Sequence, residues 1–90
     1  MLEHIFSLNK KIMAKVTIYT TPTCSYCKAA KDFFNNNEIG YIEKDVSANV
    51  TYREEMIQKT EQVGVPVIEL DNELIVGFDE KRLRKIFKIF

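Results

Sequence analysis

From Lys15 onward, the hydrophobic pattern of the chain changes its period about every ten residues. Runs of β-branched and aromatic residues, which predict strands, alternate with stretches whose apolar residues recur every three or four positions, which predict helices. The predicted strands cover residues 16–20, 41–46, 65–70 and 73–76. The order β-α-β-α-β-β-α predicts two crossover connections followed by a hairpin with its turn at residues 71–72. We therefore expect an α/β fold, a four-stranded mixed sheet with three flanking helices.

Capping residues and turn formers predict where the helices begin and end. The first helix is predicted over residues 25–36, where a run of asparagines ends it. The second is predicted to begin at Asn49 or at Thr51, which has capping-box spacing with Glu54. Asp79 is predicted to cap the third. The apolar positions expected in the core of these helices are Ala29, Ala30, Phe33, Phe34, Tyr52, Met56, Leu83, Ile86, Phe87 and Phe90, with Ile57 as a further candidate.

The chain has 90 residues, which is enough for one small domain and too few for two. Residues 13–90 carry the alternating pattern and are predicted to form that domain. Residues 1–12 stand outside it and are interpreted as a dispensable N-terminal extension, with an accessory helix as the alternative. No segment reaches the roughly 18 apolar residues of a membrane span, and the N-terminus lacks the apolar run of a signal peptide. A cytoplasmic location without a membrane partner is therefore expected.

The chain has two cysteines, Cys24 and Cys27, and equal numbers of basic and acidic residues. A formal net charge of zero argues against a nucleic-acid-binding protein, which normally has a basic excess. One cysteine pair is too few for the disulfide framework of a small secreted protein. A four-ligand zinc site is excluded as well, because the single histidine, His4, lies far from the pair. A local redox pair remains, or two cysteines that are close by chance, and no metal ligands are predicted.

The cysteine pair lies where the first predicted strand is followed by the first predicted helix. A cysteine at a helix N-terminus meets free backbone N–H groups and the positive end of the helix dipole, and both favour the thiolate. Cys24 is therefore expected to attack a disulfide and form a mixed disulfide. Cys27, one turn further on, has a spacing that a disulfide tolerates and can resolve that intermediate. Two inert cysteines in a helical turn are the alternative, and the strand–turn–helix position favours the redox role.

Pro66 is the second informative residue, because proline is tolerated only at the edge or the first position of a strand. A cis Val65–Pro66 bond would turn the backbone of Val65 toward the cysteines, where it could pair with an extended peptide. A trans proline that ends a loop is the alternative. The pattern of the sequence leaves both open.

Four segments together, in their order and spacing, resemble the glutaredoxins. They are residues 16–20, 24–31, 64–66 and 77–79, and the resemblance extends over residues 15–90. A Cys-x-x-Cys motif alone occurs across thioredoxin-like proteins, whereas its combination with Val-Pro and a Gly-aromatic-Asp turn is more specific. The resemblance implies a thioredoxin-like fold, a cis Pro66, and an enzyme that reduces protein disulfides or glutathione mixed disulfides. It also implies glutathione as co-substrate and no tightly bound cofactor.

The family's roles carry over to the matching positions of this chain. Cys24 is then the nucleophile and Cys27 the resolving thiol. The ring of Tyr26 is expected to pack beside glutathione, and the backbone of Val65, followed by Pro66, to pair with its cysteinyl peptide. The residues expected at the γ-glutamyl end lie in a turn and at the start of the last helix: Gly77, Phe78, Asp79 and Glu80. N–H groups at a helix start bind a carboxylate, and an acidic side chain binds an ammonium.

Several positions depart from the pattern of the glutaredoxins. Thr21 replaces a common lysine, Gly64 replaces a threonine before Val-Pro, and Val76 replaces the first glycine of a Gly-Gly turn. The Gly77-Phe78 pair is similar to that of small redoxins that serve ribonucleotide reductase and are reduced by thioredoxin reductase, which is one alternative. Ser25 replaces a common proline. In some family members such a residue accompanies a glutathione-ligated 2Fe-2S cluster that needs one cysteine per chain, which is the second alternative.

The partners implied by the resemblance are glutathione and proteins that are glutathionylated or carry a disulfide. Thioredoxin reductase and ribonucleotide reductase are the partners under the redoxin alternative. The basic residues within 81–88 permit a docking patch for an acidic partner. They also suit the solvated face of a helix whose negative end they complement, and this interpretation is favoured.

Overall fold

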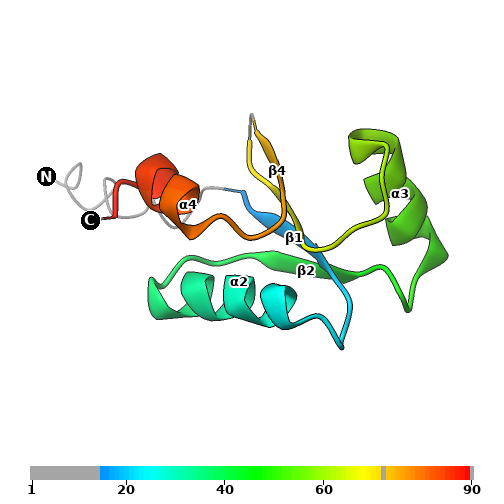
Figure 1. The fold of residues 1–90 in the computed structure, drawn as a ribbon, viewed down its shortest axis with the longest axis horizontal. Coiled ribbons are helices and arrows are strands. Elements are labelled where there is room, and N and C mark those ends of the chain that lie inside the picture. Colours follow the sequence, from blue (N-terminus) through cyan, green and yellow to red (C-terminus); the bar gives the residue numbers. More distant parts are fainter. Residues whose placement is uncertain (1–14, 72, 90) are drawn as a thin grey trace, which may run out of the picture.

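The computed structural model describes residues 15–71 and 73–89. The predicted extension of residues 1–12 and the predicted core position Phe90 lie outside the described residues. The elements, in chain order, are β1 (Thr17–Thr20), α2 (Ser25–Asn36), β2 (Ile42–Asp45), α3 (Val50–Thr60), β3 (Val67–Glu69), β4 (Leu74–Val76) and α4 (Glu80–Phe87). This order of strands and helices is the predicted one (Figure 1).

The strands form one four-stranded sheet in the order β2-β1-β3-β4. β1 pairs with β2 in parallel, whereas the β1–β3 and β3–β4 pairs are antiparallel, so the predicted mixed sheet is confirmed. The two predicted crossovers differ in kind, because the connection through α2 joins parallel strands whereas the connection through α3 does not. The connection through α3 passes β1 and enters β3 in the opposite direction, since the loop of residues 61–66 leads the chain back to the end of the sheet where β1 ends. That return places Val65 at the same end as the cysteines.

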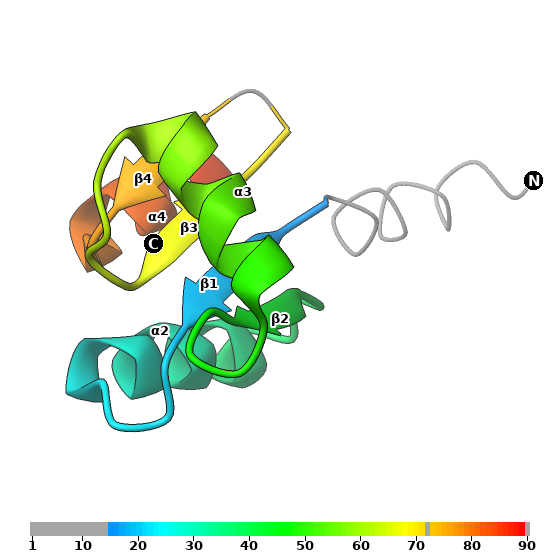
Figure 2. The same cartoon turned by 90° about the vertical axis from the view of Figure 1, so that its right-hand side faces the viewer.

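The core is divided between the two faces of the sheet. On one face, Ile18, Ile68 and Ile75 lie opposite one another on adjacent strands and pack against α2 and α4. On the other face, Tyr19 packs with Met56 of α3. Ile18 and Tyr19 point to opposite faces because successive side chains of a strand alternate. Figures 1 and 2 show α3 across the sheet from α2 and α4.

The predicted core positions of the helices are mostly confirmed. The fully or nearly buried ones are Ala30, Phe33, Phe34, Met56 and Leu83. The half-buried ones are Ala29, Tyr52, Ile86 and Phe87. Phe34 is fully buried and contacts Phe33 and Phe87 edge to face, with ring centroids 5.4 and 5.9 Å away. Aromatic contacts of this kind therefore join α2 to α4.

The helix caps decide between the two predicted starts of α3. The Asn49 side chain accepts the backbone N–H of Tyr52 at 3.1 Å, so Asn49 is the cap. The capping box at Thr51 is wrong, because that residue already lies inside the helix. The predicted cap of α4 is confirmed, since Asp79 accepts the N–H of Arg82 at 3.1 Å. In the part of the chain that the structure describes, no helix has the length and hydrophobicity needed to cross a membrane.

A polar network also holds α3 on the sheet. The buried hydroxyl of Tyr19 donates to the Glu55 carboxylate and accepts from the Lys59 ammonium at 3.2 Å. Glu55 pairs in addition with Lys44 of β2, at 2.6 Å. Burial raises the pKa of Tyr19 to about 12, so the phenol stays neutral at physiological pH. α3 is therefore fixed by hydrogen bonds as well as by its single buried apolar residue, Met56.

Candidate active site

Cys24 forms the N-terminal cap of α2. Its backbone is extended, with φ −89° and ψ 115°, and its Sγ accepts the backbone N–H of Cys27 at 3.1 Å. The N–H of Cys24 donates to the carbonyl of Thr21 at 3.4 Å, which closes the turn after β1. The half-exposed sulfur thus lies at a helix start, where free N–H groups and the helix dipole stabilise a negative charge.

Cys27 is more deeply buried than its partner Cys24. Only 1% of its surface is accessible, and neither cysteine is in a disulfide. Burial and then the hydrogen bond with Cys24 raise the pKa of the Cys27 thiol to about 12. At neutral pH, therefore, Cys27 is a protonated and shielded thiol beside an accessible sulfur. This asymmetry suits one thiol for attack on a substrate and the other for a later step.

The loop before β3 brings a backbone carbonyl to the cysteines. The thiol of Cys24 lies 3.8 Å from the carbonyl oxygen of Val65, and the Val65–Pro66 bond is cis, as the resemblance implied. Pro66 is buried, and its carbonyl accepts the N–H of Gly77 at 2.7 Å. Three segments far apart in the sequence thus meet at one place: the start of α2, the start of β3 and the end of β4.

Gln62 supports this loop and was not among the predicted site residues. Its side-chain amide donates to the carbonyl of Gly64 at 3.1 Å, and its Oε1 accepts the N–H of Gly64 at 2.7 Å. A Cβ atom at position 64 would lie 2.8 Å from that Oε1. The only sign of this arrangement in the sequence is the glycine itself, since a threonine there would occupy the space that the Gln62 side chain takes.

Gly77 has φ +94°, a backbone conformation that L-residues rarely adopt, and a Cβ atom there would meet nothing within 4 Å. Gly77→Ala is therefore expected to lower the free energy of unfolding by about 1–2 kcal/mol through backbone strain alone. Gly40→Ala is the matched control, because Gly40 has open space and no positive φ. There the free energy of unfolding should stay the same or rise by up to about 1 kcal/mol. Urea unfolding of both variants measures the difference, and equal effects would contradict the assignment of strain to Gly77.

The remaining predicted site residues differ in how exposed their side chains are and in the contacts that they already make. The ring of Tyr26 is 67% exposed beside the cysteines. Phe78 is half-buried, and its ring contacts that of Phe33 with centroids 6.1 Å apart, so its side chain belongs largely to the core. Glu80 forms an ion pair with Arg84 at 2.8 Å. Of these three side chains, that of Tyr26 is the most accessible to a ligand.

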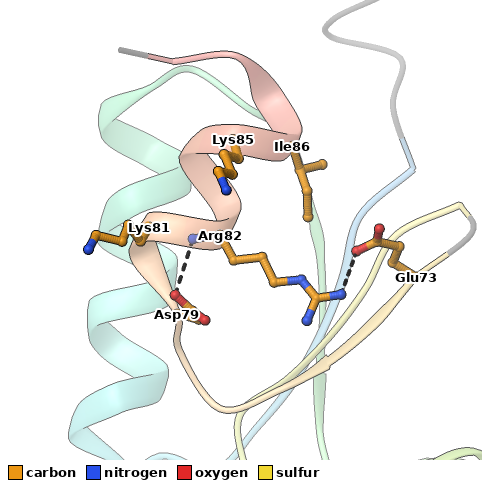
Figure 3. Close-up of a pocket in the computed structure, with 6 residues that line it drawn as sticks. All are labelled: Glu73, Asp79, Lys81, Arg82, Lys85 and Ile86. Atoms are coloured by element: carbon orange, nitrogen blue, oxygen red, sulfur yellow. Dashed lines mark hydrogen bonds and ion pairs between the residues drawn. The ribbon is translucent and has the colours of Figure 1, made fainter.

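Asp79 lies at a cavity of about 480 Å³ beside α4 (Figure 3). The cavity is lined by Glu73, Asp79, Lys81, Arg82, Lys85 and Ile86. Arg82 reaches from α4 to Glu73 near the start of β4, with 3.1 Å between guanidinium and carboxylate, while its backbone N–H binds Asp79. The carboxylate predicted to bind a ligand ammonium is thus one that also caps the helix.

A second cavity, of about 400 Å³, opens beside Cys24. Its lining comes from the β1–α2 turn, α2 and the region of β2: Thr21, Pro22, Cys24, Lys28, Lys31, Asp32, Asn35, Tyr41 and Glu43. Glu43 had not been singled out from the sequence, because nothing in its neighbourhood predicts its partners on other elements. Within residues 15–71 and 73–89, no group of three or more His, Cys, Asp or Glu is placed to hold a metal ion.

Known proteins match both the sequence and the fold. The Glutaredoxin family model matches residues 16–75. A glutaredoxin-like 8.6 kDa protein in the rubredoxin operon of Clostridium pasteurianum is 37% identical over 73 residues, covering 81% of this chain and 97% of that protein. Glutaredoxin 3 of Escherichia coli (strain K12) is 38% identical over 68 residues, covering 76% of this chain and 82% of that protein.

A solved structure adds to the evidence on the fold. NrdH-redoxin from Escherichia coli aligns with a TM-score of 0.72 at 21% identity, covering 80% of this chain and 93% of that chain. At this identity the likeness concerns the fold alone. The family match, by contrast, includes the cysteine pair and the Val-Pro segment. The chain therefore belongs to the glutaredoxin family of thioredoxin-like thiol oxidoreductases.

Proposed function

We propose that this chain is a dithiol oxidoreductase that reduces glutathione mixed disulfides and protein disulfides with glutathione as the reductant. The observation that carries this proposal is the asymmetry of the two thiols. Cys24 caps a helix and is half-exposed, whereas Cys27 is buried beside it and holds its proton. Attack by the first thiol and resolution by the second follow from that difference.

The chemistry consists of two exchanges. The Cys24 thiolate attacks one sulfur of the substrate disulfide, and the other sulfur leaves as a thiolate with the electron pair of the broken bond. Cys27 then loses its proton, attacks Cys24 Sγ and releases the second substrate sulfur as a thiolate. The substrate is reduced and the protein now carries a disulfide. Two molecules of glutathione restore the dithiol and leave as glutathione disulfide.

The backbone around Cys24 supports a role for glutathione. An extended cysteinyl peptide joined to Cys24 would reach the backbone of Val65, whose carbonyl is 3.8 Å from the sulfur. The exposed ring of Tyr26 offers an apolar wall on the same segment. The N–H of Gly77 makes the contact with Pro66, and Phe78, Asp79 and Glu80 follow directly after it. We place the γ-glutamyl end at these four residues. Backbone N–H groups at the start of α4 would bind its carboxylate.

The second candidate function is a redoxin that thioredoxin reductase reduces. Thr21 brings no positive charge to the cysteine turn, and Gln62 fills the space of the threonine side chain that Gly64 lacks. Both Asp79 and Glu80 already have partners on α4. These features favour weak binding of glutathione, and they leave the dithiol chemistry of Cys24 and Cys27 unchanged.

The electron donor distinguishes the two functions. Turnover of a glutathione mixed disulfide is measured with glutathione and glutathione reductase in one arm, and with thioredoxin reductase in the other. We expect turnover in the glutathione arm. Turnover with thioredoxin reductase alone would contradict the glutathione contacts proposed above and support the redoxin. Visible absorbance of protein purified without oxygen would instead indicate the cluster-binding alternative.

A further inference from the structure

Glu43 on β2 links two elements that surround Cys27. Its carboxylate accepts hydrogen bonds from the Lys31 ammonium at 2.9 Å and from the Thr20 hydroxyl at 2.7 Å. These bonds, with that from Lys31 first, hold the pKa of Glu43 below its usual value, so it is ionised at neutral pH. Lys31 lies one helical turn after Cys27, where side chains four residues apart are neighbours. Thr20 is fully buried at the end of β1, directly before Thr21.

Both partners of Glu43, Lys31 and Thr20, belong to segments that adjoin Cys27. Burial raises the pKa of the Cys27 thiol, whereas a hydrogen bond with the Thr21 backbone and the positive charge of Lys31 act in the opposite direction. Glu43 binds Lys31 directly. It also binds Thr20, the residue before Thr21. One carboxylate on the sheet thus binds both the lysine one helical turn after Cys27 and the threonine directly before Thr21.

Lys31 is held inward, unlike the lysine beside it on α2. The Lys31 side chain is 27% exposed in its pair with Glu43. Lys28 is 76% exposed and lies 3.4 Å from Asp32 on the outer side of the helix. The titratable groups that face Cys27 or Lys31 are Cys24, Tyr41, Glu43 and Asp45. None of these four groups is a cation, so Lys31, one helical turn from Cys27 on α2, is the positive group to test, and Lys28 provides a matched control.

We propose that the Lys31–Glu43 pair is a positioning device for the resolving step, in which it stabilises the thiolate that Cys27 must form. The inference rests on the proposed function, since it concerns the second of the two exchanges. There the Cys27 proton passes to water, a bond forms between the two protein sulfurs, and the bond from Cys24 to the substrate sulfur breaks. The substrate sulfur leaves as a thiolate with that electron pair and is reduced, while the protein dithiol is oxidised. Glu43 acts through Lys31 and touches no reacting atom.

The two exchanges can be separated with one equivalent of the aromatic disulfide dithiobis(nitrobenzoate). A first coloured thiolate is released when Cys24 attacks and a second when Cys27 resolves the mixed disulfide. Stopped-flow absorbance over the neutral to alkaline range gives a pH profile for each release. The first profile tests the nucleophile and the second tests the positioning device, without any need for glutathione.

Lys31→Met is expected to move the profile of the second release to higher pH by about one unit. At neutral pH the second release should slow by about threefold, because a tenfold smaller thiolate fraction is partly offset by the greater nucleophilicity of a more basic thiolate. The first release should change less. Lys31→Arg should restore the second profile, since it keeps the charge and the partner carboxylate.

Glu43→Ala should move the second profile in the same direction, because Lys31 loses its anchor. The double variant Lys31→Met with Glu43→Ala should show no larger shift than Lys31→Met alone. Lys28→Met should leave the second profile in place. Two results would overturn the proposal without affecting the first release. One is a shift of the second profile by Lys28→Met as large as that by Lys31→Met, and the other is a shift of the second profile to lower pH by Glu43→Ala. If the unaltered protein gave no first release at all, the proposed function would be overturned as well.

Discussion

Replacing Cys24 with serine is expected to lower turnover of a glutathione mixed disulfide by about a thousandfold or more, because a serine hydroxyl is not ionised at neutral pH. The fold should survive, since serine is a favoured N-cap and its hydroxyl can accept the N–H that Cys24 Sγ now accepts. Coupled reduction of the mixed disulfide measures turnover, and circular dichroism verifies the fold. A variant that kept its full activity would contradict the assignment of the nucleophile.

Cys27→Ser is the matched variant and should separate two activities. A glutathione mixed disulfide can still be turned over, because a second glutathione can attack the sulfur on Cys24. Reduction of a protein disulfide should fail, because the mixed disulfide with the protein substrate is no longer resolved from within the chain. Equal loss of both activities would show that Cys27 acts in some way other than resolution.

Phe34→Ala is expected to lower the free energy of unfolding by about 3–5 kcal/mol. The ring is fully buried and contacts Phe33, Tyr41 and Phe87, so its loss leaves a cavity between α2 and α4. Small domains are stable by about 5–15 kcal/mol, so the variant should be close to unfolding at ambient temperature. Urea denaturation of the reduced protein gives the value.

Two further variants make that stability measurement decisive. Phe34→Leu removes only part of the ring volume and should fall between the alanine variant and the unaltered protein. Tyr26→Ala truncates an aromatic ring that is 67% exposed, and its effect should stay within about 0.5 kcal/mol. A loss at Tyr26 as large as that at Phe34 would contradict the placement of the core.

Local patterns predicted most of the fold. The bounds of α2 match because turn residues flank a stretch of strict helical period, and α4 begins where Asp79 offers a cap. The sequence left the direction of β3 open, because a loop of the length of residues 61–66 can return the chain to either end of a sheet. Only the pairing with β1 decides it, and that pairing depends on contacts distant in sequence.

The residues of the candidate site likewise divide into those that the sequence predicted and those that it could not predict. Cys24 and Cys27 follow from a short motif at a strand–helix junction, and Val65 and Pro66 follow from the family resemblance. The links from Glu43 to Lys31 and from Tyr19 to Glu55 join residues on different elements, and no local pattern encodes them. Gln62 was missed for a different reason, since its role depends on the space beside a glycine.

The cap that Cys24 forms on α2 also bears on the direction in which electrons flow. Its sulfur can carry a negative charge toward the Cys27 N–H and the helix dipole only in the reduced protein, because a disulfide sulfur is neutral. An interaction made by the reduced form alone shifts the dithiol–disulfide equilibrium toward the dithiol, and so raises the reduction potential of the couple. Under the proposed function, the helix cap that holds the attacking sulfur therefore also makes the pair a weaker reductant, and a weaker cap would give greater reducing power.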